Sequence, residues 1–360
     1  MRIAAGKTLN FKALRLGSVA LVTLCAVLAA GLPAAGSAVE GLPGWNSDKL
    51  DDWRLAWLRS CAREPWRTSH PKTDKATARN WKRVCTQWPP SDPMALRQWL
   101  ERNFEAIPVK EPAFVTGYFE PVIEGRAAPE GTFTSPLYRM PPDLDANQAR
   151  RGKAWTRAEI SSGALSGQSL EIAWVDPVDG FFLHIQGSGV LTLPGRAPVR
   201  LGYAGNNGHA YYAIGRHLIA IGAVKPDDVS MQSVAAWLRA NPERAQAVMN
   251  RNARFIFFKP LRTAGPVGAA GAVLTAGRSL AADPSHIPYG LPVWLDLDGG
   301  GHGEGALQRL TVAQDTGAAI KGPARADYFW GTGDAMGEKA GRMKARGRLY
   351  MLLPRAGAQE

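Results

Sequence analysis

Residues 312–331 read VAQDTGAAIKGPARADYFWG and place two acids, Asp315 and Asp327, among apolar and glycine neighbours. A carboxyl group in apolar surroundings keeps its proton to higher pH, because burial disfavours the charged form, and it can then act as a general acid near neutrality. The same two aspartates would also suit a structural role in which each accepts hydrogen bonds from a glycine turn. The residues alone leave both interpretations open.

The sequence around this stretch predicts short strands separated by glycine and proline, with helices beside them. The β-type runs occupy residues 114–120, 172–175, 181–185, 254–258, 292–297, 307–314 and 348–353. Apolar periodicity and helix start and stop signals predict helices over residues 45–66, 94–106, 210–221, 231–240 and 335–346. We expect Asp334 to cap the last helix and the glycines of residues 299–303 to form a turn between two strands. These elements indicate a mainly β chain with peripheral helices.

Composition narrows the class of protein. The chain has 360 residues, 45% of them hydrophobic, and a net charge of +12 from 43 Lys and Arg against 31 Asp and Glu. This apolar content excludes a disordered or collagen-like protein, and the length fits one large domain or two ordinary ones. Residues 1–38 hold four basic residues and no acid, so the remainder carries +8. Such an excess favours an anionic partner without choosing among nucleic acid, lipid headgroups and acidic polymers.

The N-terminal segment has the layout of an export signal. Basic residues come first, an apolar run covers residues 16–32, and small residues follow. We expect cleavage near Ala35 or Ala38, which makes the mature protein periplasmic. An uncleaved anchor is one alternative, because the run approaches the ~20 residues that span a bilayer. A lipoprotein signal ending at Cys25, with anchoring in the outer membrane, is another, although the residue before that cysteine is bulky where a small one is expected.

Two cysteines, Cys61 and Cys85, remain after the leader is removed. An even count in an oxidising compartment is compatible with one disulfide. Closing that loop would contribute roughly 3 kcal/mol, because it reduces the entropy of the unfolded chain. Two buried free thiols are the alternative.

Most site chemistries find no support in the residues. The six histidines show no pair at i,i+4 and no finger-like spacing with cysteines, which argues against a zinc site. The glycines around Ser188 lack the frame of a nucleophile elbow, and neither a P-loop nor a Rossmann glycine pattern is present. Basic residues are scattered instead of grouped with aromatics, so nucleic acid is not indicated as a partner. Carboxylate chemistry at Asp315 and Asp327, without metal or cofactor, is what remains.

Motifs along most of the chain resemble those of one family. In family order they are GYFEPV at 117–122, FLHIQGSG at 182–189, GYAGNNGHAY at 202–211, SMQ at 230–232, FF at 257–258, GRSL at 277–280, IP at 287–288, the run at 315–331 and GRM at 341–343. With these motifs the chain resembles the membrane-bound lytic murein transglycosylase A family, whose C-terminal region is the 3D domain, named for its aspartates.

The resemblance implies both a fold and a reaction. The fold is a double-psi β-barrel domain formed by residues 39–124 and 260–360, after an export signal at 1–38. A smaller β-rich domain, residues 125–259, is inserted, and the substrate groove runs between the two domains. The reaction is cleavage of the β-1,4 bond between N-acetylmuramic acid and N-acetylglucosamine of peptidoglycan, leaving a 1,6-anhydromuramyl end. We expect a monomer that acts on peptidoglycan glycan strands without a cofactor, with cell-wall synthases or divisome proteins as candidate partners.

The resemblance also assigns roles to the two aspartates. The family's catalytic aspartate closes the AIKG…D stretch, which here is Asp327, and Asp315 matches its partner. Ordinary glycosidases need a second carboxylate as nucleophile or base. When the sugar's own C6 hydroxyl attacks, that function lies in the substrate, and intramolecular attack supplies effective molarities of about 10⁵ M or more. We therefore expect Asp327 to act first as acid and then as base, with Asp315 in support.

Further candidates lie within or beside the matching motifs. Rings that pack on sugar faces and polar groups that bond hydroxyl or acetamido groups are expected at Tyr118, Tyr203, Tyr211, Gln186, Ser188, Asn207 and Lys321. For each tyrosine, core packing is the alternative. Trp330 fits the barrel core better than the groove, and His184 and His209 suit structural roles at least as well as ligand binding.

Two other functions would use the same groove. One is a catalytically idle peptidoglycan-binding module, which is disfavoured because both aspartates are present. The other is a glycoside hydrolase that makes reducing ends by activating water, with Asp315 as the base. Anhydro ends, hydrated ends or no product distinguish the three hypotheses.

Overall fold

The computed structural model describes residues 36–68, 74–144, 154–299 and 305–356. The expected leader up to residue 35, with Cys25, lies outside the described residues, and so does most of the expected glycine turn. No helix in the described part of the chain is long and apolar enough to cross a bilayer.

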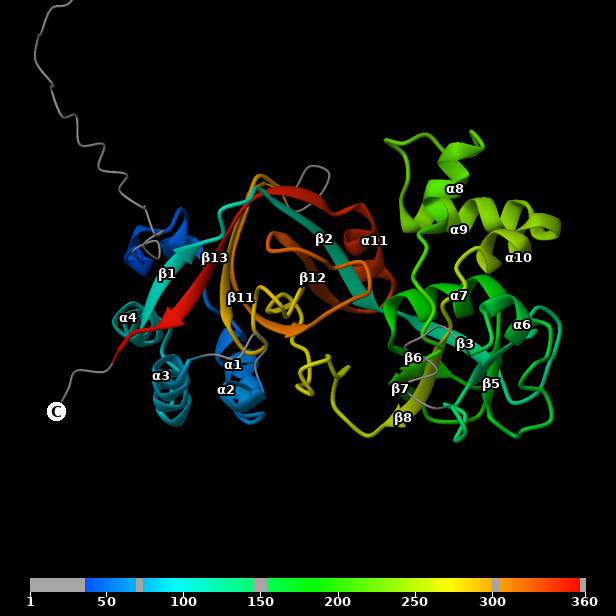
Figure 1. The fold of residues 1–360 in the computed structure, drawn as a ribbon, viewed down its shortest axis with the longest axis horizontal. Coiled ribbons are helices and arrows are strands. Elements are labelled where there is room, and N and C mark those ends of the chain that lie inside the picture. The colour runs from blue at the N-terminus through cyan, green and yellow to red at the C-terminus, as the bar shows by residue number, and fades with distance from the viewer. Residues whose placement is uncertain (1–35, 69–73, 145–153, 300–304, 357–360) are drawn as a thin grey trace, which may run out of the picture. The chain divides into compact units, whose positions relative to one another are not determined.

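Seven strands form the larger sheet (Figure 1). They are β1 (Phe104–Pro108), β2 (Ala113–Glu120), β9 (Ser279–Ala282), β10 (Pro292–Leu297), β11 (Leu307–Asp315), β12 (Arg325–Thr332) and β13 (Lys344–Pro354). Their order is β1-β13-β10-β11-β9-β12-β2, and an extra pairing of β13 with β2 closes six of them into a barrel. The β11–β9 and β12–β2 pairs are parallel, and the other pairs in the sheet are antiparallel.

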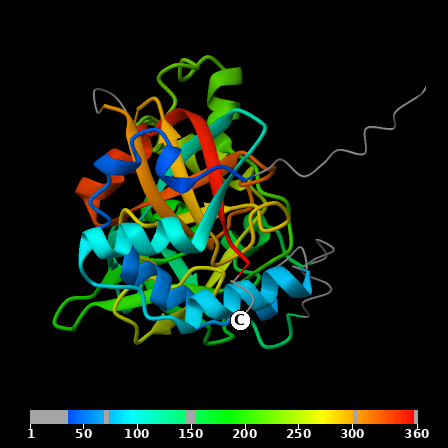
Figure 2. The same cartoon turned by 90° about the vertical axis from the view of Figure 1, so that its left-hand side faces the viewer.

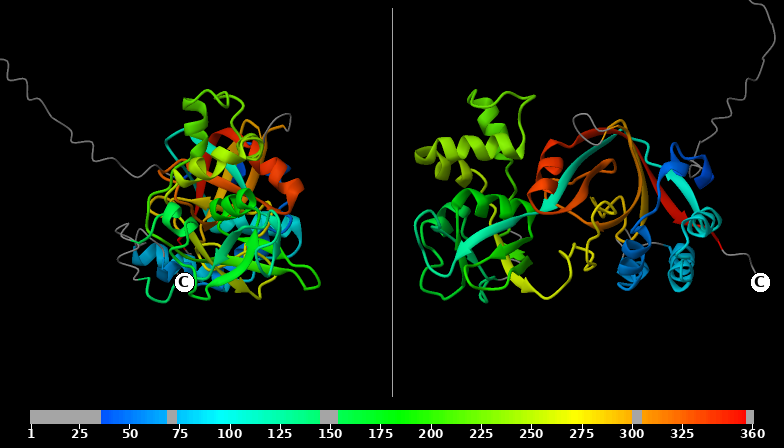
Figure 3. Two further views of the ribbon diagram at one scale, coloured as in Figure 1. Left: turned by 90° about the vertical axis from the view of Figure 1, so that its right-hand side faces the viewer. Right: turned by 180° about the vertical axis from the view of Figure 1, so that it is seen from behind.

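A second sheet of six strands lies beside the barrel (Figure 3). Its order is β4-β5-β3-β6-β7-β8, with strands β3 (Val122–Arg126), β4 (Ser135–Tyr138), β5 (Glu171–Val175), β6 (Gly189–Thr192), β7 (Val199–Asn206) and β8 (Ile256–Leu261). Helices on this side of the molecule are α6 (Arg157–Ser161), α7 (Pro177–Gln186), α8 (Ile214–Ala220), α9 (Met231–Ala240) and α10 (Pro242–Asn250). The predicted mainly β fold with peripheral helices is confirmed.

The chain passes between the two sheets at two places. Only Pro121 separates β2 from β3, and residues 262–278 return from β8 to β9. Glu120, at the end of β2, is fully buried and joins both sheets. It accepts hydrogen bonds from Arg200 Nε in β7 at 2.7 Å and from Thr332 Oγ1 in β12 at 2.7 Å. This shared carboxylate ties the second sheet to the barrel.

Helices at the N-terminal end pack on the barrel (Figure 2). Two 3-10 turns, Val39–Gly41 and Trp45–Ser47, come first, followed by α1 (Trp53–Cys61), α2 (Pro65–Thr68), α3 (Lys75–Thr86) and α4 (Pro93–Asn103). Helix α1 packs on β11, α3 on β13 and α4 on β1. Trp53 stacks on Trp57 at 5.6 Å between ring centroids, and both are fully buried. Cys61 and Cys85 form a disulfide that joins α1 to α3.

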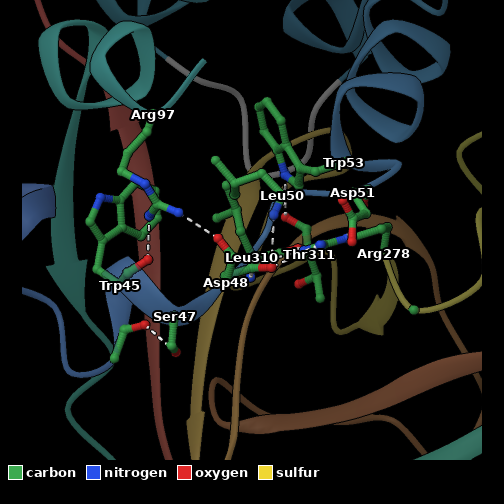
Figure 4. Close-up of polar contacts among 12 residues, drawn as sticks. Trp45, Ser47, Asp48, Leu50, Asp51, Trp53, Arg97, Arg278, Leu310 and Thr311 are labelled. Carbon is green, nitrogen blue, oxygen red and sulfur yellow. Dashed lines mark hydrogen bonds and ion pairs between the residues drawn. The ribbon is translucent and has the colours of Figure 1, made fainter. Parts of the chain in front are cut away.

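A buried ion pair fixes the segment before α1 to the barrel (Figure 4). Arg278 donates to the two carboxylate oxygens of Asp48 at 2.7 and 2.8 Å and to the Leu310 carbonyl at 3.0 Å. Both side chains of the ion pair are almost completely buried. Burial raises the pKa of Asp48, but the hydrogen bonds and charge of Arg278, together with the backbone hydrogen bonds from Leu310 and Leu50, outweigh it, so the pKa lies below its ordinary value.

Several element predictions are wrong. Residues 181–185 belong to helix α7 and not to a strand, because Asp176 caps its first turn, Pro177 starts it, and Gly187 ends it in the left-handed region. Asp334 is not a cap, since the helix α11 (Asp334–Arg342) has Gly333 before it and no capping side chain.

Four expected helices are shorter than predicted. The helix expected over 335–346 is α11, which ends at Arg342, two residues before β13 begins. The helix expected over 45–66 is α1 preceded by an irregular segment in which Leu50 and Asp52 have positive φ. The helix expected over 94–106 ends at Asn103, where β1 begins. The helix expected over 210–221 is reduced to α8.

Candidate active site

A cavity of about 720 Å³ lies between the barrel and the second sheet. The barrel contributes the ends of β2, β9, β11 and β12 to its wall, and the opposite wall comes from α7, β7, β8 and the residues before them. Residues of the 262–278 segment also line it. Both aspartates singled out in the sequence, Asp315 and Asp327, face this cavity.

The barrel brings Asp315 and Asp327 together through strand register. Asp315 in β11 and Asp327 in β12 both pair with Ala281 of β9, the strand between them. Neighbouring strands lie 4.7–4.9 Å apart, so the two Cα atoms are roughly 10 Å apart across one small side chain. All three residues line the cavity. Two carboxyl groups therefore share one wall of the cavity.

Asp315 is held by backbone donors. Its Oδ1 accepts from the amide of Ala269 at 2.9 Å and from that of Thr316 at 2.9 Å. Burial raises the pKa of Asp315 to about 6, and these hydrogen bonds oppose the rise. The first bond fixes the 262–278 segment against the barrel. Asp315 thus accepts hydrogen bonds from backbone amides, as the structural alternative expected, and its carboxyl group also lines the cavity.

Asp327 is held by side chains. Thr116 Oγ1 in β2 donates to Asp327 Oδ1, and Arg325 Nη1 donates to the same oxygen at 3.1 Å. Burial raises the pKa of Asp327 to about 6, the charge and hydrogen bond of Arg325 lower it, and the nearby Asp315 raises it. A carboxyl with this pKa is partly protonated near neutrality, as a general acid must be.

Five of the seven predicted substrate contacts line the cavity, namely Tyr118, Gln186, Ser188, Tyr203 and Tyr211. Tyr118 is half-buried, and its hydroxyl is buried beside Asp315 without a hydrogen bond of normal geometry within the described residues. Burial and the Asp315 and Asp327 carboxylates raise the pKa of Tyr118. Burial and Asp327 also raise that of Tyr211. Tyr203 is 45% exposed and offers its ring to the cavity.

The other two predicted contacts lie elsewhere. Asn207 is fully buried, and its amide is occupied by backbone groups. It donates to the carbonyls of Trp155 and Ala253 and accepts from the amide of Phe255, each at 2.8 Å. Lys321 is exposed outside the cavity lining. For Asn207, a structural role replaces the predicted sugar contact.

Trp330 and His209 make the structural contacts considered for them, whereas His184 is buried and also lines the cavity. Trp330 packs against the barrel core. His184 is buried with its Nδ1 3.1 Å from Arg157 Nη1, and burial together with Arg157 holds the pKa of His184 well below its ordinary value. His209 Nε2 lies 2.6 Å from the Ala154 carbonyl.

Sequence reasoning missed Arg325 and Thr116. Arg325 precedes Asp327 by two residues in one strand, so alternation puts both side chains on the same face. The strand over Arg325–Thr332 was not among those predicted, so this signal was missed. Thr116 had no local signal, because its strand joins β12 only through the closed barrel. No group of three or more His, Cys, Asp and Glu gathers as a metal site in the residues that the structure covers.

The comparisons with known proteins agree with this architecture. Two family models match the chain: the MltA specific insert domain at residues 114–259 and the 3D domain at residues 278–353. The chain is 39% identical over 250 residues to membrane-bound lytic murein transglycosylase A of Escherichia coli K12. That alignment covers 68% of this chain and 66% of the relative, just under two thirds of the relative's length.

Solved structures match over more of the chain. A membrane-bound lytic murein transglycosylase from Agrobacterium tumefaciens superposes with a TM-score of 0.79 at 32% identity, covering 89% of this chain and 97% of that one. Escherichia coli MltA with bound chitohexaose superposes with a TM-score of 0.68 at 30% identity, covering 89% and 92%. These neighbours define the fold as that of a lytic transglycosylase.

The chain belongs to the membrane-bound lytic murein transglycosylase A family. The family predicted from the motifs is thereby confirmed.

Proposed function

We propose that this chain cleaves the β-1,4 bond between N-acetylmuramic acid and N-acetylglucosamine in peptidoglycan and leaves a 1,6-anhydromuramyl end. Asp327 is the single acid and base of the reaction. The observation that carries the proposal is a carboxyl with a pKa of about 6 on the wall of a cavity of about 720 Å³. The family of the chain supports the choice of substrate, because relatives carry the name lytic murein transglycosylase.

The proton passes through Asp327 twice. The protonated carboxyl donates to the glycosidic oxygen as the bond from C1 to that oxygen breaks. The C6 hydroxyl of the muramyl residue attacks C1, and the Asp327 carboxylate takes the proton of that hydroxyl as the ring closes. Asp327 returns to its starting state, and no water is consumed. The sugar supplies the nucleophile, so one carboxyl suffices.

Asp315 supports this reaction in the proposal. Both hydrogen bonds from Ala269 and Thr316 reach Oδ1, which orients the carboxyl toward the cavity. Its negative form stabilises positive character at C1. The competing hydrolase would use Asp315 as a base for water, which needs carboxyl groups about 6.5–9.5 Å apart. The Cα atoms of Asp315 and Asp327 are two strand spacings apart, which is compatible with this separation of the carboxyl groups. The reaction products therefore distinguish the transglycosylase from the hydrolase.

The remaining cavity residues are proposed to bind the glycan. Tyr203 and Tyr211 offer ring faces to sugars, while Gln186 and Ser188 offer hydrogen bonds to hydroxyl or acetamido groups. The chitohexaose bound to the Escherichia coli relative supports a glycan in this cavity. We also propose that the barrel residues 39–124 and 260–360 and the inserted residues 125–259 act as the two walls of the groove.

The proposed location is the cell envelope. The basic and apolar leader predicts export, and relatives are named membrane-bound. A periplasmic enzyme, soluble or held at the outer membrane through Cys25, fits both features.

The test is product analysis of Asp327→Asn. Purified peptidoglycan is digested with the wild-type protein and the variant, and the products are identified by mass spectrometry. We expect anhydromuropeptides from the wild type and a loss of at least 100-fold in the variant, because a carboxamide cannot transfer the proton. Asp334→Asn, which changes an exposed aspartate outside the cavity, is the matched control and should keep full activity. Hydrated reducing ends would establish the hydrolase instead, and an active, folded Asp327→Asn would remove Asp327 from the mechanism.

A further inference from the structure

Three side chains around Asp327 form a closed polar network. Arg325 Nη1 donates to Asp327 Oδ1 at 3.1 Å, and Arg325 Nη2 donates to Thr116 Oγ1 at 2.7 Å. The Thr116 hydroxyl donates in turn to the same Oδ1 of Asp327. Each member therefore contacts the other two. Strand register brings these side chains together, because Thr116 of β2 pairs directly with Asp327 of the parallel strand β12.

The guanidinium of Arg325 rests on an aromatic ring. Its centre lies 5.3 Å from the centroid of Phe114, the residue that pairs with Arg325 in the next strand. Arg346 in β13 lies 5.4 Å from the same ring, also in register with Phe114. The two arginines share one ring at nearly equal distance, but only Arg325 is bonded to Asp327. Cation–π contact and the hydroxyl of Thr116 thus fix the direction of the Arg325 fork.

The network occupies one carboxylate oxygen and not the other. Thr116 and Arg325 both donate to Oδ1 of Asp327. Within the described residues Oδ2 has no hydrogen-bond partner, and the Asp327 side chain remains 21% exposed on the cavity wall. A proton on a carboxyl group sits on the oxygen that accepts no donor, because a donor and the proton would compete for the same lone pairs.

We infer that Arg325 is a positioning residue that, with Thr116, holds Oδ1 of Asp327 and leaves Oδ2 to carry the proton exchanged with the substrate. The inference rests on the proposed role of Asp327. Arg325 contacts no reacting atom in this scheme and acts through Asp327. A guanidinium bonded to a carboxylate favours the ionised form. It therefore strengthens Asp327 as an acid and stabilises the carboxylate that remains after the first proton transfer.

Other groups that face Asp327 bear on its titration. Asp315 lies on β11, Tyr118 on β2, and Tyr211 comes from the residues before α8. Lys344 of β13 pairs with Thr116 of β2 and donates a hydrogen bond to the carbonyl of Val229. Among the charged groups bonded to Asp327 in the described residues, Arg325 is the sole cation. Its removal leaves burial and Asp315, which both raise the pKa of Asp327.

The experiment is the pH profile of kcat/KM for Arg325→Met, Arg325→Lys and Arg346→Met on soluble glycan strands. Cleavage of the glycosidic bond needs protonated Asp327, so kcat/KM falls at alkaline pH as that carboxyl group ionises. In Arg325→Met the alkaline limb of the kcat/KM profile should move to higher pH by about 1 unit. The maximum of kcat/KM should be lower, because Asp327 becomes a weaker acid. Arg325→Lys keeps the charge, so the position of its alkaline limb should stay near that of the wild type. Arg346→Met removes the other arginine on Phe114 and should leave the limb in place.

A second measurement is independent of turnover. The carboxyl of Asp327 is titrated by carbon NMR in the wild type and the variants, and its assignment is checked with Asp327→Asn. The same upward shift is expected in Arg325→Met. An alkaline limb and a carboxyl pKa that both stay at the wild-type value in a folded Arg325→Met would overturn the inference. An active Asp327→Asn would instead overturn the proposed function, so the two failures are distinguishable.

Discussion

Asn207 illustrates what a single buried polar side chain does in this protein. Its amide satisfies the carbonyls of Trp155 and Ala253 and the amide of Phe255. Asn207→Ala leaves these groups without their side-chain partner, and an unsatisfied buried group costs about 1–3 kcal/mol. We expect a loss of about 3 kcal/mol in the free energy of unfolding, measured by urea denaturation.

Gln186→Ala provides the comparison for Asn207→Ala. Gln186 lines the cavity, accepts a long 3.3 Å bond from the amide of Phe119 and donates a weak one to Met231 Sδ at 3.9 Å. Its removal should raise KM and change the urea midpoint little. An Asn207→Ala protein with an unchanged midpoint and a raised KM would instead assign Asn207 to substrate binding.

At the scale of residues, the sequence predicted roles that depend on neighbouring residues, but it did not predict roles that depend on residues far away in the chain. Asp315 and Asp327 could be selected because apolar and glycine neighbours in the same segment indicate burial. The role of Asn207 depends on backbone at positions 155 and 253–255, roughly 50 residues away in either direction, and no nearby residue signals it.

The Asp48–Arg278 pair joins elements that lie far apart in the sequence. Arg278→Met would leave the Asp48 carboxylate buried without its cation, and breaking such a pair costs about 3–5 kcal/mol. We expect that loss in guanidinium-chloride unfolding near neutral pH. Arg239→Met removes an exposed partner of Asp179 and should cost less than about 1 kcal/mol. Equal effects of the two changes would contradict the structural role of the buried pair.

The same pair predicts how stability depends on pH. The pKa of Asp48 is lower in the folded protein than its ordinary value, so the folded state binds this proton less tightly than the unfolded state. Its contribution is complete above the unfolded pKa and is lost as the pH falls through the folded pKa. The difference in unfolding free energy between the wild type and Arg278→Met should therefore shrink in acid. A difference that stays constant down to the acid limit of folding would argue against Asp48 as the titrating group.

At the scale of elements, capping signals and apolar runs each succeeded at some elements and failed at others, since Asp334 does not cap α11. The helix predicted over 231–240 matches α9, because Ser230 forms a capping box with Ser233 and Pro242 follows. The strand predicted over 292–297 matches β10. Residues 181–185 failed because a short apolar run fits a buried helix as well as a strand. The signals at Asp176, Pro177 and Gly187 would have decided that case.

At the scale of the whole molecule, composition predicted no topology. Strand β2 pairs with β12 and with β13, which follow it by more than 200 residues, and no local pattern specifies such partners. The expected barrel came from the family resemblance of motifs spread along the chain. The pairing that closes the barrel is also what places Thr116 beside Asp327, so the polar network follows from topology and not from a motif.

The basic charge of the molecule predicts a dependence on salt. Without residues 1–38 the chain carries +8, and Arg254 and Lys259 on the cavity wall form no ion pair in the part of the chain that the structure describes. Peptidoglycan carries lactyl and stem-peptide carboxylates, whose attraction to these cations is screened as the Debye length falls from about 10 Å at 0.1 M to about 3 Å at 1 M salt.

Raising the salt concentration should therefore weaken binding to intact, peptide-bearing wall by about tenfold while changing turnover of short uncharged oligosaccharides little. Co-sedimentation with insoluble peptidoglycan measures the binding, and a soluble-product assay measures the turnover.

Two lysine variants locate the charge responsible. Lys259→Gln, at an exposed cavity position, should reduce the salt dependence of binding. Lys110→Gln, which changes another exposed lysine away from the cavity, should reduce it less, because charge near the bound strand acts over a shorter distance. Equal effects of the two variants would assign the salt dependence to net charge alone, and equal salt sensitivity of binding and turnover would remove the anionic groups of the wall from recognition.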